Sequence, residues 1–270
     1  MLIVRILLVS ILTGLSAPVI AELIPFDKLP KVNGFTIMDG EDEQYLAATD
    51  KGLFYSQDQG RTWGGFEGFE LPATMITKTS QGSIYAFVAA KGLALLDRKT
   101  RQWRVVNNEF GSQYLLQLTT TNGIPARMVA LNQYGKFLVS DNYGIEWQKM
   151  SGKYQPRTAE EERGQKIYMT ICQSCHGKDG VGENYSIQSL TDKKYISAPA
   201  LDASAHAWHH TDDDLVKTIL EGSPRSPRMA AWKKAGITEQ DARDLVSYMK
   251  SLWTQRELDC QGPKHMECMN

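Results

Sequence analysis

Residues 172–176 of this 270-residue chain read Cys172-Gln173-Ser174-Cys175-His176. Two residues between the cysteines place both sulfurs along one edge of a porphyrin, and the next histidine reaches the metal from the same face. This is the spacing of covalent c-type haem attachment, in which both thiols bond to the haem and the histidine ligates its iron. The stretch therefore predicts one haem c, held by Cys172 and Cys175, with His176 as the proximal ligand.

Two other kinds of site use paired cysteines. A thioredoxin-like C-x-x-C requires a βαβ context and gains nothing from the histidine. A structural zinc site requires four ligands, and the other cysteines, Cys260 and Cys268, lie far downstream with seven residues between them. Covalent haem is therefore the favoured interpretation.

The length suits two domains, and the charge limits the kind of partner. The 30 Lys and Arg residues nearly balance the 31 Asp and Glu residues, which leaves a formal net charge of −1. Neither nucleic acid nor an anionic membrane surface is expected to be the main partner.

The first 21 residues have the features of a secretory signal. Arg5 precedes an apolar run at residues 6–12, and small residues end the segment at Ala21. We predict cleavage after Ala21 and a periplasmic mature protein; an uncleaved segment would instead be a membrane anchor, at the short end of the lengths that span a bilayer. An exported protein can form disulfides.

Residues 22–152 contain a loose repeat with a period of about forty residues, the length of a propeller blade. The stretch S-Q-D-Q-G-R-T-W at 56–63 recurs as S-D-N-Y-G-I-E-W at 140–147, with a degenerate middle copy ending at Trp103. Runs rich in β-forming residues precede the copies at 44–49, 83–90 and 127–131. We expect each run to be the inner strand of a blade, followed by a hairpin.

The stretch at 56–63 resembles the Asp box of sialidase-type and assembly-factor propellers. In that motif an Asp caps backbone amides, a Gly adopts positive φ and a Trp packs between blades. The third copy has Asn in place of Asp, and the middle copy has lost the glycine and shifted its tryptophan by one. The resemblance implies a structural turn and not a glycosidase, since no arginine cluster with a paired Tyr and Glu accompanies it.

The repeat predicts an all-β partial propeller of about three blades. Four to eight blades normally close a propeller, and an open fan leaves an exposed strand edge. We therefore expect another body to complete this half. The candidates are a second copy of the chain, a separate propeller-like subunit and the chain's own C-terminal domain.

A short aperiodic linker, residues 153–157, precedes a predicted helix. Thr158 is suited to cap this helix, and Glu160, Glu161 and Glu162 lie in its first turn, where the helix dipole favours them. Apolar and small residues at helical spacing form one face, and the helix leads into Cys172.

Residues 158–256 resemble a class I bacterial cytochrome c, an all-α fold with one haem. Gly164 and Tyr168 match the first helix of the family, and residues 172–177 match its C-x-x-C-H-G site. The resemblance implies that the carbonyl of Pro199 accepts the Nδ1 proton of His176. It also implies that Met229 is the second axial ligand, before a last helix that starts at Thr238 with Asp241 in a capping box.

Five other side chains compete for the second axial position: His206, His209, His210, Met169 and Met249. His209 and His210 adjoin a helix start and are typical of solvated capping residues, whereas both methionines have the helical spacing of core residues. Met229 precedes the last helix at the distance from His176 that the family uses. Thioether ligation would raise the potential, and a second histidine would lower it.

The predicted tail, residues 257–270, contains Cys260 and Cys268. We predict that these cysteines form a disulfide that holds the chain end on the cytochrome. The alternative is a copper site built from soft or borderline ligands: His265, Met266, Cys268 and Met269.

The sequence thus predicts an exported electron carrier and not an enzyme. Its β-repeat domain would dock it to a periplasmic dehydrogenase, oxidase or reductase, since such encounters are otherwise transient. The alternative is a scaffold or assembly protein whose haem senses redox state or a gas, favoured by an open sixth position. A haem peroxidase fits less well, because that family normally has two haems and this chain has one C-x-x-C-H.

Overall fold

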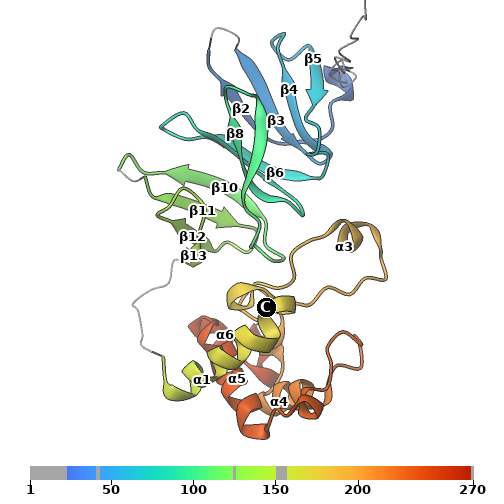
Figure 1. The fold of residues 1–270 in the computed structure, drawn as a ribbon, viewed down its shortest axis with the longest axis vertical. Helices are drawn as coiled ribbons and strands as arrows, with labels where there is room; N and C mark the ends of the chain where they lie inside the picture. Colours follow the sequence, from blue (N-terminus) through green and yellow to red (C-terminus); the bar gives the residue numbers. More distant parts are fainter. Residues whose placement is uncertain (1–22, 41–42, 124–125, 150–156, 269–270) are drawn as a thin grey trace, which may run out of the picture.

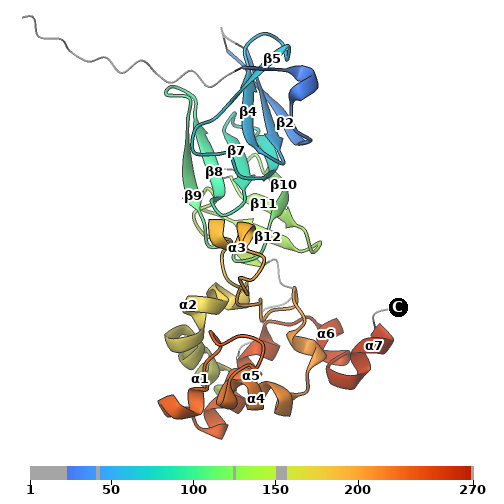
Figure 2. The same ribbon diagram turned by 90° about the vertical axis from the view of Figure 1, so that its right-hand side faces the viewer.

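The computed structural model describes residues 23–40, 43–123, 126–149 and 157–268. The predicted signal at 1–21 and all but the last residue of the predicted linker at 153–157 lie outside the described residues. An all-β half and a helical half follow one another along the long axis of the molecule (Figures 1 and 2). The predicted fold class, an all-β repeat region followed by an all-α domain, is confirmed.

The β half consists of three antiparallel sheets in chain order, which form a propeller-like fan (Figure 1). A short turn, η1 (Phe26–Lys28), follows the first strand. The first sheet contains β1 (Ile24–Pro25), β2 (Val32–Met38), β3 (Gln44–Thr49), β4 (Gly52–Ser56) and β5 (Thr62–Gly65); the second contains β6 (Ala73–Lys78), β7 (Ile84–Val88), β8 (Gly92–Asp97) and β9 (Gln102–Asn107); the third contains β10 (Leu115–Thr120), β11 (Met128–Asn132), β12 (Phe137–Ser140) and β13 (Gln148–Lys149).

The prediction of the inner strands was wrong. The three predicted runs form β3, β7 and β11, each the second strand of its blade, whereas β2, β6 and β10 lie next to one another at the centre of the fan. The inner strands line a cleft of about 600 Å³ and contribute polar residues to it, including Asn33, Thr77 and Gln117. No continuous apolar run therefore marks them in the sequence.

Each sheet has a leading face toward the next sheet and a trailing face toward the previous one. Leu46 and Leu53 on the leading face of the first sheet share an apolar core with Ala86 and Ala94 on the trailing face of the second. The second and third sheets repeat this arrangement. The leading residues there are Tyr85, Phe87, Leu93 and Leu95, and the trailing residues are Met128, Ala130 and Leu138.

The first and third copies of the repeat form the same turn. The Ser56 hydroxyl accepts the N–H of Gly60, the Asp58 carboxylate accepts the N–H of Thr62 at 2.9 Å, and Trp63 Nε1 donates to the Gly60 carbonyl at 2.9 Å. The same bonds occur in the third copy, where the amide oxygen of Asn142 replaces the carboxylate. The turn tolerates the exchange because either oxygen can accept the backbone N–H. In the first copy, the hydrogen bonds that the Asp58 carboxylate accepts, chiefly from the Thr62 N–H, lower the pKa of Asp58 to about 2.

The middle copy shows what the missing glycine changes. Asp97 still accepts the backbone N–H groups of Lys99 and Thr100, but Arg101 adopts a positive φ of 57°. The shifted Trp103 is buried, and its Nε1 has no hydrogen-bond partner in the described part of the chain. Trp63 and Trp147 donate that bond to the carbonyl of the turn glycine, the residue type that this copy lacks.

The helical half begins as predicted, with Thr158 capping α1 in a capping box. Thr211 and Thr238 cap the two longest following helices in the same way. None of the helices among the described residues is long and apolar enough to cross a membrane. The helices are α1 (Ala159–Ile167), the π-helical turn η2 (Tyr168–Cys172), α2 (Gln173–His176), α3 (Ile187–Thr191), α4 (Asp212–Glu221), α5 (Glu239–Ser251), α6 (Gln255–Asp259) and α7 (His265–Cys268), with short 3₁₀ turns η3 (Lys178–Gly180), η4 (Ala207–His209), η5 (Trp232–Ala235) and η6 (Gly262–Lys264).

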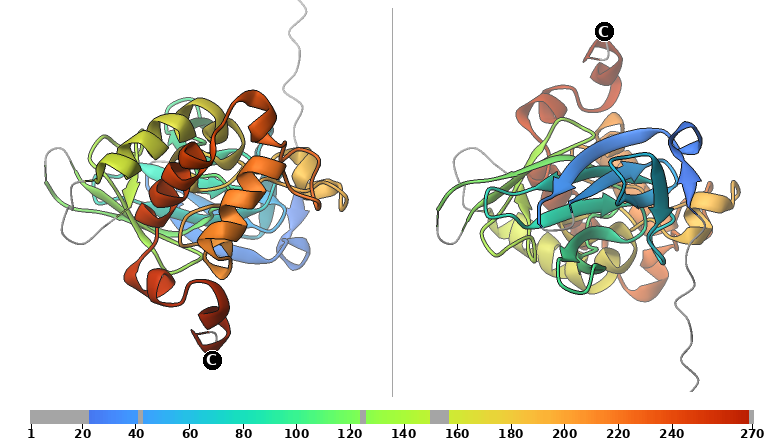
Figure 3. Two further views of the ribbon diagram at one scale, coloured as in Figure 1. Left: turned by 90° about the horizontal axis from the view of Figure 1, so that it is seen from below. Right: turned by 90° about the horizontal axis from the view of Figure 1, so that it is seen from above.

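The crossing of α1 and α5 organises the helical half, which Figure 3 shows from below. Gly164 permits the close approach, since a Cβ there would lie 1.9 Å from the Asp244 carbonyl oxygen. The rings of Tyr168 and Tyr248 lie 5.1 Å apart in the same core. Arg163 closes the edge of the crossing by donating to the Asp244 carboxylate at 2.6 Å.

The two halves are joined by a second contact besides the chain connection. Gly111 N–H donates to Asn184 Oδ1 at 2.6 Å, and Ser112 N–H donates to the Val181 carbonyl at 3.1 Å. The ring of Tyr114 stacks on that of Tyr185 at 4.9 Å. We call this contact, between residues 110–114 and 181–185, the clamp.

Candidate haem-attachment site

Both cysteines of the C-x-x-C-H stretch lie in helical backbone. Cys172 ends the π-helical turn and Cys175 lies in α2, so the βαβ context of a thioredoxin is absent around these described residues. Both thiols are free. Burial, with a smaller effect of Cys175, raises the pKa of Cys172 to about 11. Redox-active cysteines have lowered pKa values, so the site does not favour disulfide exchange.

The histidine of the stretch is oriented by the proximal loop. His176 Nδ1 lies 2.8 Å from the Pro199 carbonyl oxygen. A carbonyl can only accept, so Nδ1 carries the proton and Nε2 keeps its lone pair for a metal. Burial lowers the pKa of His176, although the bond to Pro199 opposes the effect. The ring is therefore held in the neutral, ligating form.

The glycine after His176 is needed by the backbone. Gly177 has φ of 74°, and a Cβ there would lie 2.4 Å from the Gly182 carbonyl oxygen. Gly182 N–H in turn donates to the His176 carbonyl at 2.7 Å, and the Tyr168 hydroxyl donates to the Gly177 carbonyl at 2.7 Å. The segment after the histidine is thus folded tightly beneath it.

Glu183 connects the two loops that carry the predicted haem-site residues Pro199 and Met229. Its carboxylate accepts two hydrogen bonds from Arg228, both at 2.8 Å, and one from the Ala198 N–H at 2.8 Å. The Tyr195 hydroxyl donates to it at 2.5 Å. Arg228 has the largest effect among the groups that lower the pKa of Glu183 to about 2. Sequence reasoning missed this residue.

Met229 lies in a closed loop between α4 and η5. Its backbone N–H donates to the Ser226 carbonyl, and its own carbonyl accepts the Ser223 N–H, both at 3.1 Å. The side chain is half-buried against the apolar core of the helical half. The loop starts at Gly222, whose φ of 85° ends α4.

The competing ligands occupy different surroundings. Met249 is a core residue, 4% exposed, as predicted. The expectation that Met169 is a core residue was wrong, because the π-helical turn leaves it 59% exposed.

Four of the five histidines gather near the tail, which the sequence pattern did not reveal. The ring of His209 stacks on that of His265, with centroids 4.6 Å apart. The ring centroid of His206 lies 6.0 Å from those of both His209 and His210. The tail brings His265 to this place, because Gln261 Nε2 donates to the His210 carbonyl. The fifth histidine is His176.

The tail contains a disulfide between Cys260 and Cys268, with Cα atoms 6.0 Å apart. This bond removes the thiolate from the alternative copper site, and Met269 lies outside the described residues. His265 Nδ1 bonds to the Gly262 carbonyl. In the part of the chain that the structure describes, no group of three or more His, Cys, Asp or Glu side chains is arranged to hold a metal ion.

The donor set of the site fits a covalent haem. It offers two free thiols and an imidazole whose Nδ1 is already bonded. The predicted thioether ligand, Met229, lies in a separate loop that packs on the same helical core. Soft thioether and imidazole ligands suit haem iron.

Residues 159–249 match the family model described as cytochrome c oxidase, cbb3-type, subunit III. This part of the chain is a cytochrome c domain. The match covers about a third of the sequence and lies entirely within the helical half. A cytochrome c domain indicates a haem-based electron carrier and not a catalytic enzyme.

Several solved structures resemble part of the chain weakly. YCF48 bound to a D1 peptide is 16% identical, with a TM-score of 0.35. The match covers 44% of this chain and 40% of the YCF48 chain. Virginiamycin B lyase from Staphylococcus aureus is 10% identical with a TM-score of 0.34, and covers 50% of this chain and 46% of its own. The chain thus covers less than half the length of either structure. No curated protein matches it.

Proposed function

We propose that the protein is an exported mono-haem c-type cytochrome that passes single electrons to or from a periplasmic redox partner. Cys172 and Cys175 hold the haem covalently, His176 and Met229 ligate its iron, and Pro199 orients the histidine. The hydrogen bond from His176 Nδ1 to the Pro199 carbonyl carries the proposal, because it leaves Nε2 free to bind iron.

The bound haem would supply the one-electron chemistry, and the chain supplies its surroundings. His176 is held neutral in one orientation, and the Arg228–Glu183 pair ties the Met229 loop to the loop of Pro199. Thioether ligation favours the ferrous state and raises the potential. A site whose ligands are fixed in this way changes little between oxidation states, which suits fast electron transfer.

The β half is proposed to be the docking module. Its partner would be a periplasmic dehydrogenase, oxidase or reductase, and tethering would turn a brief encounter into a lasting assembly. Export by residues 1–21 is part of the proposal. The disulfide in the tail supports an oxidising compartment.

The test is the visible spectrum and redox titration of the exported protein beside Met229→Ala. We expect sharp c-type bands in the reduced protein and a weak red band in the oxidised protein. The variant should lose the red band, and its potential should fall because the thioether no longer favours ferrous iron.

Met249→Ala is the matched control, since Met249 lies in the core and should leave the red band in place. An unchanged Met229→Ala spectrum at low potential would remove Met229 from the site. Carbon monoxide binding to the reduced wild-type protein would favour the gas sensor instead.

A further inference from the structure

The third sheet ends the fan with a leading face that no other sheet of the described residues covers, and part of this face lines the central cleft. The registers β11 to β12 place Val129 opposite Val139 and Leu131 opposite Phe137, all on the side away from the second sheet. Every one of these side chains is apolar, and Phe137 is 51% exposed. The equivalent leading faces of the first two sheets are buried against the next sheet.

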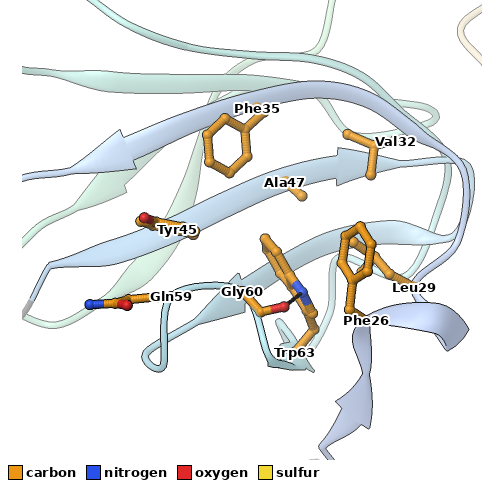
Figure 4. A pocket seen from close by; sticks show the side chains of 9 residues that line it. All are labelled: Phe26, Leu29, Val32, Phe35, Tyr45, Ala47, Gln59, Gly60 and Trp63. Atoms are coloured by element: carbon orange, nitrogen blue, oxygen red, sulfur yellow. Dashed lines mark hydrogen bonds between the residues drawn. The ribbon is translucent and has the colours of Figure 1, made fainter.

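The first sheet begins the fan with a trailing face that no other sheet of the described residues covers. Tyr45, Ala47 and Phe54 lie on this face, opposite the side that packs on the second sheet. An apolar groove of about 460 Å³ opens over it (Figure 4). Besides Tyr45 and Ala47, its lining includes Trp63 and the exposed rings of Phe26 and Phe35.

The tryptophans show what such a groove accepts. Trp103 on the trailing side of the second sheet packs against Phe66 and Phe69, which follow the first sheet, with ring centroids 5.9 and 6.2 Å away. The ring of Trp147, which precedes β13 of the third sheet, likewise lies 6.0 Å from that of Phe110, which follows the second. Trp63 is the equivalent residue of the first sheet, and its groove takes the place of the preceding blade.

The cytochrome domain does not fill this position. Hydrogen bonds and ring stacking join the halves through the clamp, whose residues 110–114 connect the second sheet to the third. The clamp therefore lies on a loop between sheets, and the two end faces belong to strands.

We propose that two copies of the chain close their fans into one ring of six sheets, with the leading face of each third sheet on the trailing face of the other first sheet. The chain itself supports the choice of partner, because it already contains this leading-to-trailing interface twice. Six sheets lie within the range that closes a propeller. Two-fold symmetry satisfies both end faces at once, so the assembly stops at two copies.

The test is the mass of the full-length haem-loaded protein by light scattering after size exclusion. We expect twice the chain mass for the wild type. Phe137→Asp places a charge on the leading face and Tyr45→Asp places one on the trailing face, so each variant should run at the mass of one chain. Ile187→Asp is the control, because Ile187 is 67% exposed on α3 of the cytochrome domain and should leave the dimer intact.

Mixing the two monomeric variants tests the polarity of the interface. Phe137→Asp keeps an intact trailing face and Tyr45→Asp keeps an intact leading face, so the mixture should form heterodimers through one sound interface. Circular dichroism and the haem spectrum should match the wild type in both variants. A monomeric wild type, a dimer that survives Phe137→Asp, or a ladder of larger species would overturn the proposal. None of these outcomes depends on the axial ligands of the haem.

Discussion

At the scale of single residues, the Glu183 carboxylate joins the loop of Pro199 to the loop of Met229. One carboxylate holds Arg228, Tyr195 and the Ala198 N–H, with its side chain 19% exposed. The resemblance to a family pattern predicted Pro199 and Met229 as haem-site residues. The sequence could not identify Glu183, because nothing local marks a carboxylate whose partners lie 12, 15 and 45 residues away.

We expect Glu183→Gln to lower the free energy of unfolding by about 1–2 kcal/mol, because charge-assisted bonds are lost from a partly exposed pair. The folded pKa of Glu183 is about 2, below the usual value of about 4.3. The stabilisation is therefore complete above pH of about 4.3 and is lost as the pH falls toward 2. Denaturant titrations of both proteins between pH 7 and pH 2 measure the difference.

Glu239→Gln is the control for this prediction, because Glu239 also pairs with an arginine, Arg243, but on the surface of α5. It should cost about 0.3–0.5 kcal/mol. A Glu183→Gln variant as stable as this control at neutral pH would contradict the prediction.

At the scale of elements, the helix starts were easier to predict than the inner strands of the fan. Each of three helix starts has a capping threonine followed by an acidic residue at the third helical position: Thr158, Thr211 and Thr238. Neighbouring residues in the sequence are therefore enough to mark where these helices begin. The inner strands could not be predicted in the same way. Their neighbours come from other sheets, and β2 and β10 border the central cleft with many exposed residues.

The crossing of α1 and α5 gives a prediction at this scale. Gly164→Ala should lower the free energy of unfolding by about 1–3 kcal/mol, because the new methyl group would overlap the Asp244 carbonyl and force the helices apart. Lys166→Ala, on the exposed side of α1, should change it by less than about 0.5 kcal/mol. Thermal unfolding of both variants measures the effect. Equal stabilities would show that the helices can separate without loss.

At the scale of the whole molecule, the clamp joins the β half to the segment that follows His176. Gly182 donates to the His176 carbonyl and Ser112 donates to the neighbouring Val181 carbonyl, so one short segment serves both contacts. The sequence placed a linker between two domains and gave no sign of this second connection. Its polar and aromatic residues resemble those of any surface loop.

Gly111→Ala should uncouple the two halves. A Cβ at Gly111 would lie 2.4 Å from the Val181 carbonyl oxygen and 2.5 Å from that of Gly182. We expect one thermal transition in the wild type and two in the variant, followed by haem absorbance and by β-sheet circular dichroism. Gly135→Ala is the control, because Gly135 also has positive φ but no atom within 4 Å of the added Cβ. A single transition in Gly111→Ala would show that the clamp does not couple the halves.

The clamp also limits which cytochrome domains could replace the one in this chain. A cytochrome domain from another protein could bring its own cysteines, histidine and methionine, yet it would lack the partners of Gly111 and Tyr114 unless it also carried counterparts of Asn184 and Tyr185. Grafting the β half onto an unrelated haem carrier would therefore give two domains joined through the linker alone, without the clamp. We therefore expect the residues on the two sides of the clamp to change together among related chains.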